Sequence, residues 1–340
     1  MVVDQDLRWM RRALEQARRG IGRTTPNPVV GATIVTDEGV VVGDGAHERA
    51  GEPHAEIHAL DEAGDRARGA TLYCTLEPCC HTGRTGPCTE RIIAAGIKRV
   101  VAAMEDPNPV VSGRGFAALR AQGIDVVEGV GGYESARLNQ PFLTAVRERR
   151  PFVIVKAATS IDGRIAAAPG VRTPLTSKEA NRRVQYLRAQ VDAVGIGSGT
   201  LLVDDPLLTA RDVYRERPLV RVIFDRRRRT PPHARVFSTV EQGPVRVVGA
   251  DGEDLQSILR ELAGEGIQSL LLEGGAQLHA AAWDADVVDY VQLYVTPVAL
   301  GPGGVPLFGG RPWSLSSLIE PKAEMLGPDT LIEGYVHRPH

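Results

Sequence analysis

Three of the four cysteines of this 340-residue chain lie in one short stretch, PCCHTGRTGPC, at residues 78–88. Upstream, PHAE places His54 two residues before Glu56. Cys79 and Cys88 are each predicted to open a helix, where free N–H groups and the helix dipole lower a thiol's pKa. His54 supplies a third ligand. Two sulfurs and one nitrogen leave a fourth position open, which is typical of a catalytic zinc site.

Glu56 stands where a general base can act beside that metal. Zinc lowers the pKa of a bound water to about 7, and Glu56 can take its proton and pass it on. HAEIH also spaces His54 and His58 one helical turn apart, but the metalloprotease pattern needs the glutamate directly after the first histidine. The order H-A-E followed by P-C is instead the signature of zinc deaminases.

The remaining cysteines have other interpretations. Clustered cysteines can be plain core thiols, and Cys74, in a predicted strand, is interpreted as one. Cys80 adjoins Cys79, and no spacing argument decides between them as ligand. The insert between the ligands is longer than in P-C-x-x-C and carries His81 and Arg84, two groups suited to a phosphate on a small substrate.

Composition limits the classes of partner. The 40 basic and 42 acidic side chains give a net charge of −2, which does not indicate a nucleic-acid or membrane partner. The amino-terminal segment has no signal-peptide core, and no run approaches the ~18 apolar residues of a membrane span. We expect a cytoplasmic protein that binds small molecules or proteins. The one charge run, DRRRRTPPHAR at 225–235, favours a solvated turn over a polyanion site.

Helical and strand patterns alternate along the chain, which predicts helix-covered sheets. In the first half we expect helices in 6–20, 53–64, 88–96, 113–123 and 132–150, and strands in 27–35, 40–45, 70–76, 99–104 and 124–129. A new apolar strand begins at Pro151, so a domain boundary is placed near 147–151. The second half is predicted to hold strands in 151–158, 191–197, 219–225, 244–250, 269–275 and 290–297, and helices in 177–190, 254–266 and 276–284.

Many motifs, in order, resemble one family. In the first half they are NPVVGATIV, GEPHAEIHAL, TLEPC, HTGRTGPC and MEDPNP. In the second half they are SIDGRIA, RAQVDAVGIGSGTLLVDDPLLTAR and LLEGGAQL. Over almost its whole length the chain resembles the RibD family of bifunctional riboflavin-biosynthesis deaminase-reductases.

The resemblance implies an α/β chain with an N-terminal cytidine-deaminase-like domain at 1–148 and a C-terminal dihydrofolate-reductase-like domain at 149–340. The first domain, with Zn²⁺, is implied to deaminate 2,5-diamino-6-(5-phosphoribosylamino)pyrimidin-4(3H)-one. The second is implied to reduce the ribosyl group of the product to ribityl with NADPH. The substrate is thus a small phosphorylated pyrimidine, with no nucleic-acid or membrane partner, and a homo-oligomer is expected.

Individual residues follow from the same resemblance. In the first domain His54, Cys79 and Cys88 hold zinc, Glu56 moves protons, Asn27 contacts the ring, and His81 and Arg84 bind the phosphate. In the second domain the implied cofactor-binding residues are Ala158, Pro174, Thr200, Asp204, Gly274 and Gly275. The implied substrate-binding residues are Arg172, Arg188, Leu208, Arg211 and Glu273. Lys156 and Asp204 are the candidate catalytic groups for protonating the opened sugar, with ordinary surface charge as the alternative.

The reductase motifs are weaker by themselves than the zinc motif. GIGSGT, at 195–200, follows a predicted strand but is neither G-x-G-x-x-G nor a Walker loop, and a plain packing turn explains it equally. LLEGG, at 271–275, lets backbone N–H groups approach a phosphate at a helix start. VRTPLTS, at 171–177, departs from the family, because Arg172 and Pro174 stand where relatives commonly carry Ser and Trp. Arg172 either binds the substrate phosphate or points to solvent.

Two other functions remain open from the residues. A deaminase of nucleic-acid bases shares H-A-E and P-C, but it calls for a basic channel and the shorter cysteine spacing. A non-catalytic, zinc-stabilised interaction module explains the ligands but leaves Glu56 without a role. Ammonia release from the pyrimidine distinguishes the three.

Overall fold

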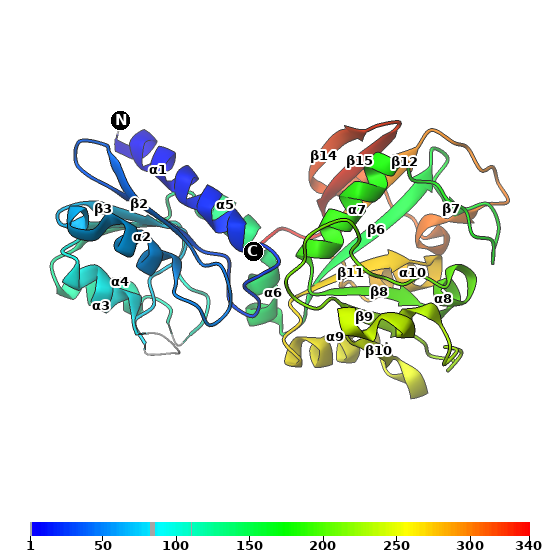
Figure 1. Ribbon diagram of the computed structural model, residues 1–340. Helices are drawn as coiled ribbons and strands as arrows, with labels where there is room; N and C mark the ends of the chain where they lie inside the picture. The colour runs from blue at the N-terminus through cyan, green and yellow to red at the C-terminus, as the bar shows by residue number, and fades with distance from the viewer. Residues whose placement is uncertain (1, 82–85, 110) are drawn as a thin grey trace. The chain divides into compact units, whose positions relative to one another are not determined.

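A computed structural model describes residues 2–81, 86–109 and 111–340 (Figure 1). The chain forms two compact units. The first runs to Arg147 and includes His340, and the second is Glu148–Pro339. No helix among the described residues is long and apolar enough to cross a membrane.

The first unit is built on a five-stranded sheet in the order β2-β1-β3-β4-β5. β1 pairs antiparallel with β2 and β3, whereas β3, β4 and β5 are parallel. The strands are β1 Gly31–Val35, β2 Val41–Ala46, β3 Thr71–Cys74, β4 Arg99–Ala102 and β5 Asp125–Glu128. The helices are α1 Val2–Ala17, α2 Ala55–Ala63, α3 Cys88–Ala94, α4 Arg114–Ala121, α5 Gly132–Leu138 and α6 Gln140–Glu148.

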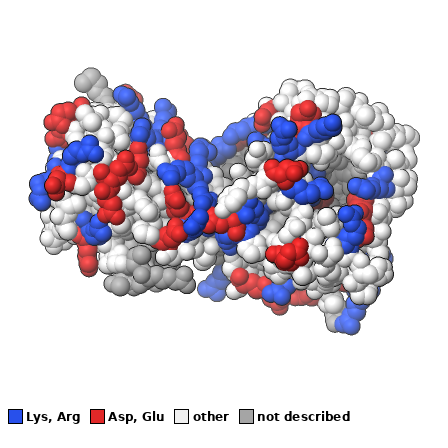
Figure 2. Space-filling view, in the orientation of Figure 1, with Lys and Arg blue, Asp and Glu red and all other residues white. Residues whose placement is uncertain are grey.

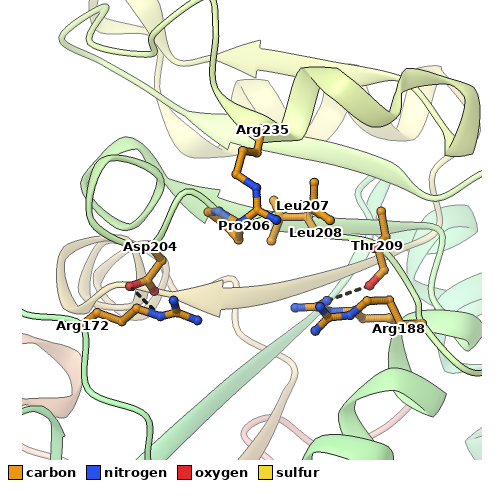
Figure 3. A pocket seen from close by; sticks show the side chains of 9 residues that line it. Arg172, Arg188, Asp204, Pro206, Leu207, Leu208, Thr209 and Arg235 are labelled. Atoms are coloured by element: carbon orange, nitrogen blue, oxygen red, sulfur yellow. Dashed lines mark hydrogen bonds and ion pairs between the residues drawn. The ribbon is translucent and has the colours of Figure 1, made fainter.

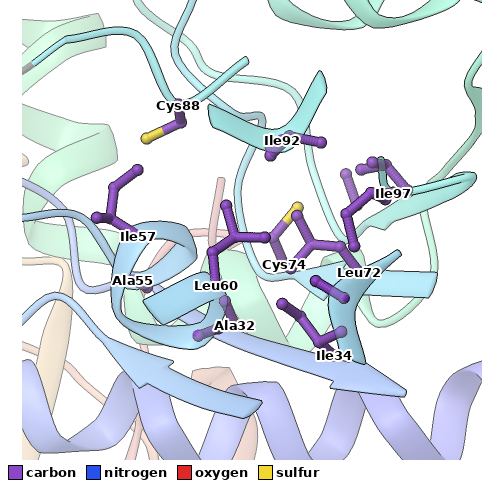
Figure 4. Packing of buried hydrophobic residues seen from close by; sticks show 14 of the residues in the cluster. Ala32, Ile34, Ala55, Ile57, Leu60, Leu72, Cys74, Cys88, Ile92 and Ile97 are labelled. Atoms are coloured by element: carbon purple, nitrogen blue, oxygen red, sulfur yellow. The ribbon is translucent and has the colours of Figure 1, made fainter. Parts of the chain in front are cut away.

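Helices cover both faces of this sheet. On one face, residues of α2, α3 and α4 pack with alternate strand residues such as Ile34 and Leu72 (Figure 4). On the other face, α1 packs against Val35 and Val101. Successive strand residues therefore enter opposite cores, as the alternation of side chains along a strand requires. Cys74 lies in the first core and is fully buried, as expected from the sequence.

Glycines bring α2 close to the sheet. A Cβ on Gly45 of β2 would lie 1.9 Å from the carbonyl oxygen of Ala55, and one on Gly43 would lie 2.1 Å from that of Ala59. Only glycine fits such approaches. Strand β2 thereby fixes the first turn of α2, which carries His54 at its N-cap and Glu56.

The helical stretch expected at 132–150 is two helices, α5 and α6. Between them Asn139 is buried, and its side-chain oxygen accepts a hydrogen bond from the Val29 N–H at 2.8 Å. Its amide nitrogen donates to the Val29 carbonyl at 3.0 Å. Pro141, near the start of α6, lacks the N–H that a continuous helix needs. Through these two hydrogen bonds, Asn139 holds the junction of α5 and α6 against the chain segment before β1.

The second unit is built on an eight-stranded sheet in the order β10-β9-β8-β11-β6-β12-β15-β14. Its strands from β10 to β12 are parallel, and β15 and β14 are antiparallel additions. The strands are β6 Phe152–Ser160, β8 Ala193–Gly197, β9 Val220–Phe224, β10 Val245–Val248, β11 Ser269–Gly274, β12 Tyr290–Thr296, β14 Ile319–Leu326 and β15 Asp329–Tyr335. β7 Arg164–Ala166 and β13 Val305–Pro306 pair separately.

Helices cover this sheet on both faces as well. They are α7 Lys178–Gln190, α8 Ser198–Asp204, α9 Leu255–Gly264 and α10 Ala276–Asp284. Residues of α9 and α10 pack on one face with Val153 and Leu272. The other face packs around Ile154 and Leu271. The sequence analysis did not identify α8, β7, β13, β14 or β15. Strand β14 is exposed at most positions and carries charged residues, so it lacks the apolar pattern of a buried strand.

Acidic and basic side chains are interspersed on the face of each unit shown in Figure 2. This mixing agrees with the near-neutral net charge of −2.

Candidate active sites

His54, Cys79 and Cys88 meet in the first unit. Their ligand atoms all lie within 4.8 Å of one another. The His54 Nδ1 lies 3.2 Å from the Cys88 sulfur and 3.5 Å from the Cys79 sulfur. Zinc bonds of about 2.1 Å to nitrogen and 2.3 Å to sulfur put tetrahedral ligand atoms roughly 3.6 Å apart. Both the spacing and the donor types therefore fit a zinc ion.

Each ligand comes from the end of an element. His54 is the N-cap of α2, and Cys88 is the first residue of α3. Cys79 lies in the loop after β3, so the expectation that it opens a helix is wrong. Pro78 lies in that loop, and of its described residues, 75–81 form no helical turn. The Cys88 N–H donates to the Cys79 sulfur at 3.4 Å, which brings the loop to the start of α3.

The two thiols are electrostatically linked. Hydrogen bonds from Cys88 and His54 lower the pKa of Cys79 to about 4. The contact with Cys79, together with burial, raises the pKa of Cys88. A bound cation would stabilise both thiolates.

Glu56 lies in the first turn of α2 and is 3% exposed. Burial raises its pKa, against the opposing effect of His54. Within the part of the chain that the structure describes, its Oε2 has no hydrogen-bond partner. A buried carboxylate oxygen without a partner is costly in a purely structural role. Its place two residues from His54 suits a group that exchanges protons with a ligand of the metal.

Cys80 lies outside the ligand cluster found among the described residues, although it adjoins Cys79. It is partly exposed and free. Of the two adjacent cysteines, the structure therefore places Cys79 beside His54 and Cys88. The sequence alone had left the choice between Cys79 and Cys80 open.

His47 links Asn27 to the ligand cluster, because it contacts both Asn27 and His54. The Asn27 side-chain nitrogen lies 3.1 Å from the His47 Nε2, and the His47 ring packs edge-on against His54 at 5.3 Å between centroids. The sequence analysis missed His47, which is buried and lies just after β2. Its position between the motifs PNPVVG and PHAE is the one feature of the sequence that could have indicated a place in the site. His81 is exposed in the loop after Cys80, and Arg84 lies outside the described residues.

The second unit contains a cavity of about 200 Å³ (Figure 3). Five residues predicted for the reductase site line it: Arg172, Arg188, Asp204, Leu208 and Arg211. Arg235 also lines it, and the sequence analysis missed this residue except as the end of the charge run. Four arginines and one aspartate give the cavity an excess of positive charge, which suits an anionic ligand.

Arg188 and Glu273 bind each other. Their contacts are 2.5 Å between Nε and Oε1 and 2.8 Å between Nη2 and Oε2. Although burial opposes it, the charge of Arg188 holds the pKa of Glu273 below its usual range. Arg188 also donates to the Thr209 carbonyl at 2.8 Å, visible in Figure 3. The two predicted substrate residues thus form one rigid pair.

Lys156 lies on β6 with its amine 5.5 Å from the Tyr294 ring centroid. Burial lowers its pKa, opposed by the charge of Glu273. A lysine with a lowered pKa holds its proton less firmly and is a better acid. Lys156 and Ala158 lie on the same strand, outside the residues that line the cavity.

In the turn LLEGG, predicted to bind a phosphate, one backbone N–H is already bonded to a side chain of the protein. The Gly275 N–H donates to the Thr200 hydroxyl at 3.1 Å. Cβ atoms on Gly274 and Gly275 would lie 3.3 and 2.9 Å from that hydroxyl. GIGSGT and LLEGG therefore meet at the ends of β8 and β11. The sequence alone had left open whether GIGSGT belongs to a nucleotide site or is a plain packing turn.

Arg172 lies in an irregular segment between β7 and α7, with Pro174 exposed nearby. Its Nε is 3.9 Å from the Asp204 carboxylate, and its side chain is 69% exposed. It lines the cavity, so its guanidinium faces both the site and solvent. Burial raises the pKa of Asp204, and Arg172 opposes this. Leu208, which also lines the cavity, has a φ of 54°, an uncommon value for a residue with a side chain.

The fold and the two sites define a class: a zinc-binding deaminase domain joined to a reductase domain. Residues 3–104 match the family model described as the cytidine and deoxycytidylate deaminase zinc-binding region. Residues 151–332 match the RibD C-terminal domain. The chain belongs to the RibD family, and the α/β fold class expected from the sequence is confirmed.

Relatives match over nearly the whole length. The riboflavin biosynthesis protein RibD of Aquifex aeolicus is 39% identical over 353 residues, with 98% of this chain and 99% of that protein covered. That of Escherichia coli is 42% identical over 327 residues, covering 87% and 89%. A Thermotoga maritima diaminohydroxyphosphoribosylaminopyrimidine deaminase/5-amino-6-(5-phosphoribosylamino)uracil reductase superimposes with a TM-score of 0.88 at 36% identity, covering 98% and 99%.

Proposed function

We propose that the chain catalyses two consecutive steps of riboflavin biosynthesis. The first unit removes the 2-amino group of 2,5-diamino-6-(5-phosphoribosylamino)pyrimidin-4(3H)-one as ammonia. The second reduces the ribosyl group of the resulting uracil to ribityl, with NADPH as hydride donor. The RibD relatives and both matched domains support this assignment.

In the first unit, His54, Cys79 and Cys88 would hold zinc, which supplies an activated water at neutral pH. Glu56 takes a proton from the attacking water and returns it to the departing amine. Asn27, positioned by His47, orients the pyrimidine ring. His81 and Arg84 are proposed for the substrate phosphate because they stand at the positions that the family resemblance implies for it and are side-chain types suited to a phosphate.

In the second unit, Arg188, Arg211, Leu208 and the Glu273 carboxylate hold the phosphorylated substrate. Arg172 adds positive charge at the mouth of the cavity. Ala158, Pro174, Thr200, Gly274 and Gly275 are proposed to contact the cofactor. Lys156 and Asp204 are the two candidates for the proton that the opened sugar takes up as the hydride arrives.

The meeting of His54, Cys79 and Cys88 beside the buried Glu56 carries the proposal. A nucleic-acid deaminase leaves the whole reductase unit unexplained. An interaction module does not explain why the buried Glu56 Oε2 has no hydrogen-bond partner among the described residues. The residues point instead to chemistry at the metal.

The test follows ammonia release and NADPH consumption together, using the diaminopyrimidine as the only substrate. The parent protein is expected to do both. Glu56→Gln keeps the shape of the side chain but cannot carry the proton, so ammonia release falls at least about 100-fold. With the deaminated uracil supplied, the same variant should consume NADPH at the parent rate. Ammonia release at the parent rate, with zinc retained, contradicts the role of Glu56.

Cytoplasmic location and a homo-oligomer stay predictions. Light scattering on the purified protein tests the second.

A further inference from the structure

The cavity of the second unit is bounded by two separate stretches of chain. Arg188 comes from the last turn of α7, whereas Leu208 and Arg211 come from the segment 205–219 between α8 and β9. Residues 205–219 form no helix or strand, so regular backbone hydrogen bonding does not fix the position of this segment. The contacts that hold it against α7 therefore decide the shape of the cavity.

Arg215 joins this segment to the C-terminal end of α7. Its Nη1 lies 2.7 Å from the carbonyl oxygen of Arg188, 3.0 Å from that of Ala189 and 2.7 Å from that of Val191, the C-cap. Its Nη2 donates to the Pro218 carbonyl at 3.2 Å, within the segment itself. The last carbonyls of a helix have no partner within the helix, and a cation there also complements the helix dipole. One guanidinium thus binds the end of α7 and closes the segment on itself.

The Arg215 side chain is half-buried and charged. Burial lowers its pKa to about 10, and the charge of Asp192 opposes this, so the guanidinium keeps its proton at neutral pH. Its hydrogen bonds are therefore charge-assisted, a class roughly twice as strong as neutral ones. Arg215 lies outside the residues that line the cavity, so its contribution to the site is to place other side chains.

Two further hydrogen bonds join α7 to the segment at the cavity itself. The Arg188 Nη1 donates to the Thr209 carbonyl at 2.8 Å (Figure 3). The Arg211 N–H donates to the side-chain oxygen of Gln185 at 2.9 Å. Both depend on how far the segment lies from α7. Arg215 fixes that separation only four residues after Arg211.

The other side of the Arg188 guanidinium is held by Glu273 of β11. Arg188 therefore has a fixed place, and the position of Arg211 relative to it follows from the segment. We propose that Arg215 is a positioning residue of the reductase, which holds Arg211 at the distance from Arg188 that the phosphorylated substrate requires. This rests on the proposed reductase function and adds to it a residue that acts through the substrate-binding side chains.

The test measures steady-state NADPH consumption with the deaminated uracil for the parent and for Arg215→Met. The methionine keeps much of the length of the side chain but removes the charge and the hydrogen bonds to α7 and Pro218. The KM for the uracil should rise about tenfold, the effect of weakening one hydrogen bond to a charged group. The kcat and the KM for NADPH should stay within about twofold of the parent values, because the substrate contacts weaken equally in the ground and transition states.

Arg215→Lys is the conservative variant. It keeps the charge and can reach the end of α7, but it lacks the planar fork that also reaches Pro218. Its KM for the uracil should rise about threefold, because the ammonium restores only part of the hydrogen bonding. If Arg215→Met does not fold, Arg215→Lys decides by itself.

Arg217→Met is the matched control. Arg217 lies in the same segment, and its Nη1 is 2.5 Å from the Asp192 carboxylate, which also accepts hydrogen bonds from the N–H groups of Gln268 and Ser269. Arg215→Met and Arg217→Met should both lower the unfolding temperature, measured by calorimetry, because each removes a partly buried charged hydrogen bond. Only the Arg215 variant should raise the KM for the uracil.

A change that only destabilises the fold lowers the fraction of active protein, so it reduces the apparent kcat and leaves KM at the parent value. The proposal is overturned if either Arg215 variant has the parent KM for the uracil, or if the KM for NADPH rises by the same factor. It is also overturned if Arg217→Met raises the KM for the uracil as much as Arg215→Met does. A parent that consumes NADPH with the uracil keeps the reductase assignment in each of these cases, whereas a parent that consumes none overturns both.

Discussion

Cys79 and Cys80 are adjacent, yet only the first has its sulfur close to His54 and Cys88. Cys80→Ser should therefore keep one zinc per chain, whereas Cys79→Ser and Cys88→Ser should each lose most of it, because two ligands hold zinc poorly. Metal analysis of the three purified variants measures this. Zinc lost from the Cys80 variant alone would reverse the ligand assignment.

Arg172 combines an exposed guanidinium with a place in the cavity wall. Arg172→Ala should raise the KM for the phosphorylated substrate about tenfold, which corresponds to about 1.5 kcal/mol of lost binding free energy. This is the lower end for a hydrogen bond to a charged group, because solvent screens the charge. The kcat should change little, since the contact is equal in ground and transition states. Steady-state kinetics at two salt concentrations checks both.

Arg182→Ala is the control for that measurement, because Arg182 is an exposed arginine of α7 outside the cavity lining. Both variants lose one positive charge. If they change KM and its salt dependence equally, Arg172 acts only through total charge and has no place in the site.

Among the elements, β2 positions the zinc site by its closeness to α2. In Gly45→Ala the new methyl would lie 1.9 Å from the Ala55 carbonyl, between His54 and Glu56 in the chain. The start of α2 must shift, so the unit should lose about 1–3 kcal/mol of stability and part of its zinc affinity. Thermal unfolding with zinc titration measures both.

Gly39→Ala is the matched control. Gly39 has a φ of +78° but open space where a Cβ would lie. It should cost about 1–2 kcal/mol through backbone strain alone and leave zinc affinity unchanged. Equal zinc loss in both variants would show that stability, not the position of α2, governs the metal.

Elements with a strong local pattern were predictable, and those decided by distant contacts were not. The zinc ligands lie in two short motifs, so the sequence could place them together. The error at Cys79 arose because this residue is joined to the start of α3 by a hydrogen bond from the Cys88 N–H, a contact between residues nine positions apart that helical periodicity does not indicate. The break at Asn139 depends on Val29, far away in the chain. Arg235 reaches the cavity only through the packing of the segment after β9.

At the scale of the whole molecule, each unit has its own sheet, its own core and its own site. Removing zinc with a chelator should therefore abolish ammonia release but leave NADPH consumption intact when the deaminated uracil is supplied. Added zinc should restore the first activity. Parallel loss of both activities on chelation would show that the reductase depends on the metal.

The order of strands in the second sheet has a consequence for synthesis. β6 is the first strand of its unit to leave the ribosome, yet Phe152 pairs with Ser269, and Ile154 with Tyr290. At about 5–20 residues per second, β6 waits on the order of ten seconds for these partners. All five strands of the first sheet are complete before β6 is made. The first unit can therefore fold during translation, while the apolar strand that carries Lys156 has no sheet partner until β11 and β12 have been made.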